Sequence, residues 1–219
     1  MADAKISGLY VIVDTDACRG RDALDIARLA LEGGASMLQW RDKRREKGAQ
    51  LTEARALREL CAEHGALLIV NDHTDLALAA GADGVHVGQG DLPVEEVRRI
   101  VPAGFIVGAS TNNVDEALAA EAAGASYIAI GSIYPTSSKE PERTRAASPE
   151  RLSEVKAAVG VPVVAIGGID ASNIGEVVRA GADAVAVISA VCGADDVTAA
   201  ARELVEQFQQ QGARPTASS

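Results

Sequence analysis

The sequence predicts a (β/α)8 barrel, and three observations carry that prediction. Eight short apolar runs rich in β-branched residues recur along the chain, and their nearly continuous hydrophobicity is typical of parallel strands covered by helices. Segments with helical periodicity lie between these runs. A Gly-Ala joint precedes several runs, as in residues 81–87 and 181–187, where it would end a helix and turn the chain into the next strand. Eight strands alternating with eight helices indicate a closed parallel barrel.

The expected strands share this apolar, β-branched character. In chain order they are residues 9–14, 36–41, 67–72, 84–89, 105–110, 127–134, 161–168 and 184–190. A doubly wound open sheet is the alternative, but it would normally use fewer strands. With 219 residues, the chain would be a small example of the barrel fold.

Helices are expected in the connections between the strands. Residues 49–64 and 194–210 each carry an apolar stripe at helical spacing. Residues 93–100 open with a proline that suits a first helical position, and residues 148–155 open with a Ser-Pro cap. Residues 74–80 leave room for barely two turns of helix.

A single barrel domain is expected over residues 1–210, followed by a polar tail over residues 211–219 that is expected to be disordered. No apolar run approaches the ~18 residues needed to span a bilayer, and the N-terminal residues do not resemble a secretory signal. The three cysteines are widely spaced and suggest neither a metal site nor a disulfide framework. They are expected to be packing residues in the reducing cytoplasm.

The net charge of −10 argues against nucleic acid or an anionic membrane as a partner. It does not exclude small phosphorylated substrates, because a binding site responds to its local charges. The main basic cluster, residues 40–47, follows directly on an expected strand end. Composition alone leaves open whether this cluster is a solvated loop or an anion-binding site. It also leaves open whether the protein is a homo-oligomer.

Polar side chains stand where the expected strands end, at the face of such barrels that carries the chemistry. Closing the sheet would bring them around one mouth, although they are far apart in the sequence. They are Gln39, Arg41, Lys43, Asn71, Asp72, Gln89, Asp91, Ser110, Thr136, Ser138, Lys139, Gly167, Gly168 and Ser189. The sequence therefore predicts a common pocket at the carboxyl ends of the strands.

Asp72 and Asp91 are the candidate metal ligands. They follow adjacent strands, and two carboxylates without a nearby histidine pair suit Mg²⁺, which keeps several waters and is bound jointly with substrate phosphates. The alternative is that each carboxylate caps a helix, one beginning at His73 and the other at Pro93.

Arg41, Lys43 and Lys139 would supply positive charge for an anionic group, and Arg41 can hold two oxygens at once. Residues 167–168 and Ser189 stand where many barrels bind phosphate through backbone amides. A pair of glycines also makes an ordinary tight turn. It indicates a phosphate site here because it follows the seventh of the eight expected strands.

The longest irregular segment, residues 135–148, is long enough to act as a lid, with a solvent loop as the alternative. None of the histidines is expected to act in catalysis. His64 stands near a helix end, and His73 is expected to be exposed. His86 stands inside a strand, where a hydrogen-bonded residue of the core or the barrel lining is expected.

Seven motifs, taken together and in this order, resemble the thiamine-phosphate synthase family, also called thiamine-phosphate pyrophosphorylase. They are QWRDK (39–43), VND (70–72), GVHVGQGD (84–91), GAS (108–110), GSIYPTSSK (131–139), AIGGI (165–169) and VIS (187–189). The resemblance covers about residues 8–192. It implies an enzyme of thiamine biosynthesis that joins 4-amino-2-methyl-5-hydroxymethylpyrimidine diphosphate to 4-methyl-5-(2-phosphoethyl)thiazole. The products would be thiamine phosphate and pyrophosphate, and Mg²⁺ would be the cofactor.

Carried over position by position, the resemblance assigns three sets of site residues. The pyrimidine diphosphate would be held by Gln39, Trp40, Arg41, Asp42, Lys43, Asn71, Ser110 and Lys139. The metal would be held by Asp72 and Asp91, and the thiazole phosphate by Thr136, Ser137, Ser138, Gly168, Ile188 and Ser189. The catalytic residues would be Arg41, Lys43, Ser110 and Lys139.

Some of these assignments depart from the family's pattern or rest on the resemblance alone. Ser137 and Ile188 have no other support, and Ser138 stands where the family usually has threonine. Asn112 stands where the family often has histidine, and residues 140–148 are unusually charged.

The implied reaction is a dissociative substitution, in which pyrophosphate leaves the pyrimidine methylene and the thiazole nitrogen then attacks that carbon. It needs no side-chain nucleophile, which agrees with the lack of a convincing Ser-His or Cys-His set in the sequence. One alternative is a thiazole tautomerase, an isomerase for which the diphosphate and metal half of the site would be superfluous. The other is a non-catalytic barrel that binds a phosphate ester without Mg²⁺.

Overall fold

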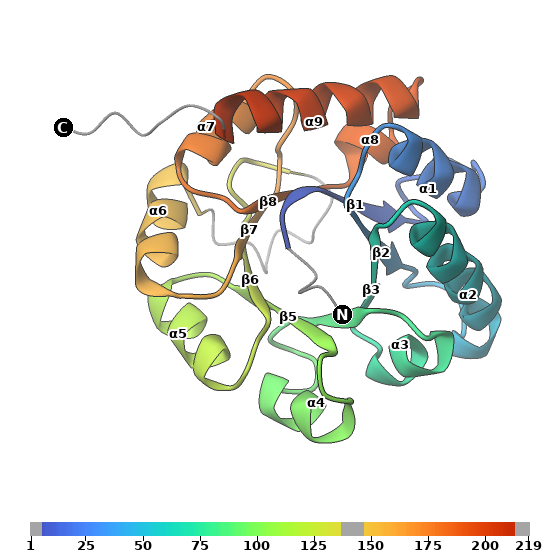
Figure 1. Ribbon diagram of the computed structural model, residues 1–219, viewed down its shortest axis with the longest axis horizontal. Coiled ribbons are helices and arrows are strands. Elements are labelled where there is room, and N and C mark those ends of the chain that lie inside the picture. Colours follow the sequence, from blue (N-terminus) through green and yellow to red (C-terminus); the bar gives the residue numbers. More distant parts are fainter. Residues whose placement is uncertain (1–5, 137–146, 213–219) are drawn as a thin grey trace.

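Eight parallel strands close into a barrel with helices on its outside, as expected (Figure 1). This is a computed structural model, which describes residues 6–136 and 147–212. The strands are β1 (Gly8–Asp14), β2 (Met37–Arg41), β3 (Leu67–Asn71), β4 (Gly84–Val87), β5 (Ile106–Thr111), β6 (Tyr127–Ile130), β7 (Val163–Ile166) and β8 (Ala184–Val187). Each strand pairs with the next along the chain, and β1 pairs with β8 to close the sheet.

The helices alternate with the strands. They are α1 (Ala23–Glu32), α2 (Lys47–Glu63), α3 (Thr74–Ala80), α4 (Val94–Ile100), α5 (Val114–Ala122), α6 (Pro149–Ala158), α7 (Ile174–Arg179), α8 (Ser189–Cys192) and α9 (Val197–Gly212). The short helix α8 was not expected from the sequence. Helix α9 runs to Gly212, so the first two residues of the expected tail are helical. None of the helices in the described ranges is long and apolar enough to cross a membrane.

Local sequence signals explain where several elements begin and end. Ser148 caps α6 by accepting a hydrogen bond from the Arg151 amide, and a proline follows in the first turn, as expected. Pro93 is the N-cap residue of α4 and not its first helical residue. Strand β7 stops at Ile166, earlier than expected, because Gly167 and Gly168 have φ angles of 103° and 64° that a strand cannot contain.

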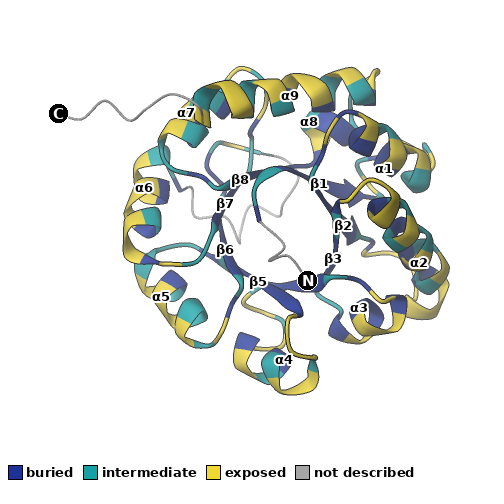
Figure 2. Cartoon of the chain, viewed as in Figure 1, coloured by how far each residue is buried: buried dark blue, intermediate teal, exposed yellow. Residues whose placement is uncertain are grey.

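The period-two pleat divides each strand between two apolar layers. On β1, Leu9 and Val11 face the helices, whereas Tyr10 and Ile12 face the barrel interior. Figure 2 shows the ring of strands almost wholly buried, while the outer faces of the helices are exposed.

The same alternation decides which side chains reach the carboxyl-end mouth of the barrel. On β2, Gln39 and Arg41 face inward, while Trp40 between them faces the helices. On β3 the inward residue at the strand end is Asn71, and on β5 it is Ser110. The fold therefore collects polar side chains from separate strands at one opening.

Candidate active site

Two adjoining cavities occupy the carboxyl-end mouth of the barrel. The larger, of about 1390 Å³, takes in these sequence-predicted site residues: Gln39, Arg41, Lys43, Asn71, Asp72, Gln89, Asp91, Ser110, Ile188 and Ser189. The smaller, of about 340 Å³, takes in Thr136, Gly167, Gly168, Ile188 and Ser189. Ile166, Ala186, Ile188 and Ser189 line both, so the cavities meet along β7 and β8. Ser137, Ser138, Lys139 and most of the expected lid lie outside the described residues.

Asp72 and Asp91 meet at the wall of the larger cavity. Asp91 Oδ2 accepts a hydrogen bond from the Gly88 amide at 2.8 Å. Burial raises the pKa of the Asp72 carboxyl, and the charge of Asp91 and a hydrogen bond with it raise that pKa further, whereas the charge of Lys43 lowers it. Asp72 also has a φ of 61°, a left-handed conformation that is strained for a residue other than glycine.

The capping alternative for these two carboxylates is wrong. The N-cap residues of α3 and α4 are His73 and Pro93, and neither helix has a side-chain capping hydrogen bond. Asp72 and Asp91 instead converge on each other.

This pair fits Mg²⁺ as a metal shared with substrate. In residues 6–136 and 147–212, no cluster of three or more His, Cys, Asp or Glu side chains is arranged to hold a metal. Two carboxylates alone suit an ion that keeps several waters and takes further oxygens from a diphosphate. A divalent cation would also relieve the repulsion that raises the pKa of Asp72.

Arg41 lies in the larger cavity, but it does not act alone. Its guanidinium forms an ion pair with Asp14, the last residue of β1. Asp14 is buried, and its other oxygen accepts the Asp16 amide at 3.0 Å. Lys43 lines the same cavity.

The structure does not bring Trp40 or Asp42 into either cavity. Trp40 is buried under α2, where its Nε1 donates to Gln50 Oε1 at 3.2 Å. Asp42 accepts hydrogen bonds from the Arg44 and Arg45 amides and from the Arg45 side chain. Neither side chain therefore faces a cavity, and the role of these two residues in substrate binding stays a prediction of the family resemblance. Pleat alternation turns Trp40 outward, and Asp42 organises the loop that carries Lys43.

Ser110 and Gln39 are joined by hydrogen bonds that cross the barrel interior. Ser110 Oγ lies 2.8 Å from His86 Nε2, and His86 Nδ1 lies 2.9 Å from the Tyr127 hydroxyl. The Tyr127 hydroxyl lies 3.1 Å from the Tyr10 hydroxyl, which accepts from Gln39 Nε2 at 2.7 Å. His86 is thus a hydrogen-bonded lining residue, as expected.

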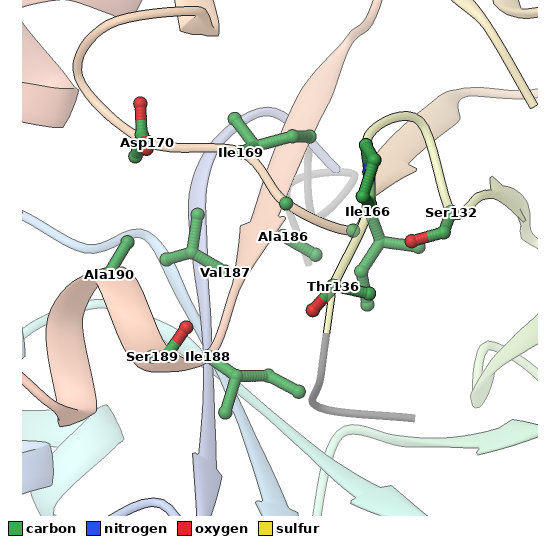
Figure 3. A pocket seen from close by; sticks show the side chains of 13 residues that line it. Ser132, Thr136, Ile166, Ile169, Asp170, Ala186, Val187, Ile188, Ser189 and Ala190 are labelled. Atoms are coloured by element: carbon green, nitrogen blue, oxygen red, sulfur yellow. The ribbon is translucent and has the colours of Figure 1, made fainter. Parts of the chain in front are cut away.

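The smaller cavity brings together the described residues expected to hold the thiazole phosphate. Figure 3 shows Thr136 and Ser189 on opposite sides of it, with Ile188 at its edge. Gly168 is required here, because its φ is 64° and a Cβ atom would lie 2.6 Å from the Pro135 carbonyl oxygen. The glycine therefore lets the loop after β7 pack closely against the segment after β6.

Several residues of the larger cavity were not expected from the sequence. Asp14 ends the first strand just as Arg41 ends the second. The polar residue at the end of the first expected strand was therefore a signal that could have identified it. Tyr10 reaches the cavity floor from within a strand. Glu116 accepts hydrogen bonds from Gln89 and Asn112 at the rim, and nothing in the helical sequence around it signals this.

Comparison with known proteins identifies the family. A family model described as thiamine monophosphate synthase matches residues 9–191. The chain belongs to this family. This confirms the resemblance seen in the motifs, and it makes the protein a thiamine-phosphate synthase by family, an enzyme of the transferase class in thiamine biosynthesis.

Individual relatives agree with this membership. The thiamine-phosphate synthase of Methanoculleus marisnigri is 53% identical over 200 residues, which cover 91% of this chain and 94% of the relative. That of Shouchella clausii is 44% identical over 206 residues, covering 92% and 96%. The solved structure of thiamine phosphate pyrophosphorylase from Pyrococcus furiosus matches with a TM-score of 0.88 at 40% identity, covering 95% of this chain and 98% of that one.

Proposed function

We propose that the protein joins 4-amino-2-methyl-5-hydroxymethylpyrimidine diphosphate to 4-methyl-5-(2-phosphoethyl)thiazole, forming thiamine phosphate and pyrophosphate. The observation that carries this proposal is the pairing of two adjoining cavities at the barrel mouth. The larger one has the carboxylate pair Asp72 and Asp91 on its wall and cations beside it, which suits a diphosphate with a divalent metal. The smaller one lies between the β7 and β8 loops, where many barrels bind a phosphate.

The protein's own residues would work by charge and alignment. Arg41, oriented by Asp14, and Lys43 would bind the diphosphate and stabilise its growing charge as the bond to the pyrimidine methylene carbon breaks. Thr136 and Ser189 would bind the phosphate of the thiazole and so aim its ring nitrogen at the same carbon.

Mg²⁺ would be held by Asp72 and Asp91, and when bound it would add charge neutralisation at the leaving pyrophosphate. No residue needs to act as a nucleophile, because the thiazole nitrogen forms the new bond. Lys139, Ser137 and Ser138 keep the roles that the family resemblance implies.

The test is a fluorescence assay for thiamine phosphate after its oxidation to the thiochrome. Both substrates are supplied together and each alone, with Mg²⁺ and with an excess of EDTA. Product that needs both substrates and disappears with EDTA would support the proposal. Folded protein that forms no product, but isomerises a thiazole carboxylate phosphate or only binds a phosphate ester, would refute it.

A further inference from the structure

The hydrogen-bonded chain from Gln39 to Ser110 has both ends at the larger cavity, and its three middle members lie among the barrel's inward-facing residues. It links β2, β1, β6, β4 and β5 in turn through Gln39, Tyr10, Tyr127, His86 and Ser110. Both end residues line the cavity and are expected to hold the pyrimidine diphosphate. The three middle residues have no role in the proposed reaction so far.

If every link of this chain is kept, the orientation of the Gln39 amide sets the direction in which its protons run. The amide NH₂ of Gln39 donates to the Tyr10 hydroxyl, and a continuous chain then requires the single Tyr10 proton to go to Tyr127. The Tyr127 proton would then go to His86 Nδ1. Burial raises the pKa of both phenols, which keeps each of them protonated.

In this chain His86 would carry its proton on Nε2 and donate it to Ser110 Oγ. The hydroxyl proton of Ser110 is left to point into the cavity as a donor. At the other end, the Oε1 atom of Gln39 has no hydrogen-bond partner among residues 6–136 and 147–212, and it is left to the cavity as an acceptor.

We propose that Tyr10, Tyr127 and His86 are positioning residues that fix Gln39 as an acceptor and Ser110 as a donor, and so select an aminopyrimidine. This rests on the proposed function. The exocyclic amino group of the substrate would donate to Gln39 Oε1, and Ser110 would donate to a ring nitrogen or a diphosphate oxygen. The 4-oxo analogue reverses the pattern: it turns a carbonyl oxygen toward Gln39 Oε1 and leaves both acceptors unpaired.

The opposite polarity is a distinct and measurable state. If the Gln39 amide were turned over, every donor in the chain would reverse, and His86 would carry its proton on Nδ1. Gln39 would then present NH₂ to the cavity, and Ser110 would present a lone pair. The tautomer of His86 thus reports the polarity directly.

The first experiment is nitrogen NMR on protein labelled with ¹⁵N-histidine. The chain has three histidines, so His64→Gln and His73→Gln assign the other two signals. We expect His86 in the Nε2–H form. An Nδ1–H form would overturn the proposed polarity. This result does not depend on catalysis, so it decides the point even if the proposed function fails.

The second experiment measures kcat/KM with the aminopyrimidine diphosphate and with its 4-oxo analogue. Tyr10→Phe frees the Gln39 amide to turn over, and we expect it to lower the preference for the amino substrate by about tenfold, mainly through KM for that substrate. Tyr127→Phe, which breaks the chain one step further on, should do the same.

Tyr134→Phe is the matched control, because the chain's third tyrosine donates to Glu176 and lines neither cavity. It should leave the preference unchanged. Active Tyr10→Phe and Tyr127→Phe proteins that keep the full preference would overturn the proposal. Wild-type protein that forms no product from either pyrimidine would instead count against the proposed function. If either Tyr10→Phe or Tyr127→Phe fails to fold, the other variant and the NMR result test the proposal.

Discussion

Asp14 and Arg41 are register partners at the ends of neighbouring strands, and their side chains form an ion pair at the wall of the larger cavity. The Asp14 side chain is only 7% exposed and that of Arg41 18%. A carboxylate so placed cannot itself attract a diphosphate. Its role is to hold a guanidinium that would otherwise sample many rotamers, and its second oxygen ties down the loop at Asp16.

Asp14→Asn keeps the shape and the hydrogen bond to the Asp16 amide but removes the charge that orients Arg41. We expect KM for the pyrimidine diphosphate to rise by about ten- to a hundredfold, because a charge-assisted hydrogen bond contributes about 1.5–3 kcal/mol, while kcat falls less. Steady-state kinetics measure this. Asp25→Asn, which removes an exposed partner of Arg28, is the control and should change neither constant. An unchanged KM in Asp14→Asn would show that Arg41 needs no such partner.

Asp91→Asn should separate function from stability. It removes one of two carboxylates that repel each other, so we expect the melting temperature to stay the same or rise. Turnover should fall by about a hundredfold, since a lost charge contact costs about 2–4 kcal/mol of transition-state stabilisation. Calorimetry and a Mg²⁺ titration of activity measure the two effects. Unchanged activation by Mg²⁺ would remove Asp91 from the metal site.

The sequence predicts the barrel well because its strands are buried on both faces, so each one appears as a continuous apolar run. It predicts strand ends less well, because they depend on backbone conformation. Gly167 and Gly168, which looked like part of the seventh strand, take φ angles of 103° and 64° and end it. Helix α8 is too short to leave a periodic pattern.

The sequence likewise predicts some of the site residues and not others. Gln39 and Ser110 could be predicted because polar residues at strand ends meet at one mouth. The motif around Trp40 does not show that its side chain faces the helices, because a motif does not say which face of a strand a residue occupies, although pleat alternation does. Tyr10 and Tyr127 are 117 positions apart and lie on strands that do not pair, so their contact depends on barrel closure.

Gly108 leaves the space that Tyr127 occupies. A Cβ atom at this position would overlap the tyrosine ring, so we expect Gly108→Ala to lower the free energy of unfolding by about 1–3 kcal/mol. Gly48→Ala is the matched control, because nothing lies within 4 Å of its added Cβ in the first turn of α2. It should be neutral or stabilising by about 0.5 kcal/mol. Urea denaturation compares the two variants. Equal stabilities would mean that the ring of Tyr127 can move aside at little cost.

Cys61 should make the protein less stable at alkaline pH. Burial, and then the charge of Asp83, raise the pKa of its thiol to about 12 from 9.0, while Arg58 opposes this. Below pH 9.0 the thiol is protonated in both states, so its titration costs nothing. Above that pH the unfolded chain releases the proton while the folded protein keeps it. The free energy of unfolding therefore falls as pH rises from 9.0 toward 12.

Cys61→Ala removes this titration. At neutral pH it should be less stable than the wild type by about 1 kcal/mol, because it leaves a small void beneath α2. As pH rises above 9.0, the difference should shrink by up to about 1.4 kcal/mol per pH unit, because only the wild type still loses stability through this group. Urea denaturation of both proteins under reducing conditions, repeated at increasing pH, measures the trend. A difference that stays constant would mean that water reaches the thiol and lets it ionise in the folded protein.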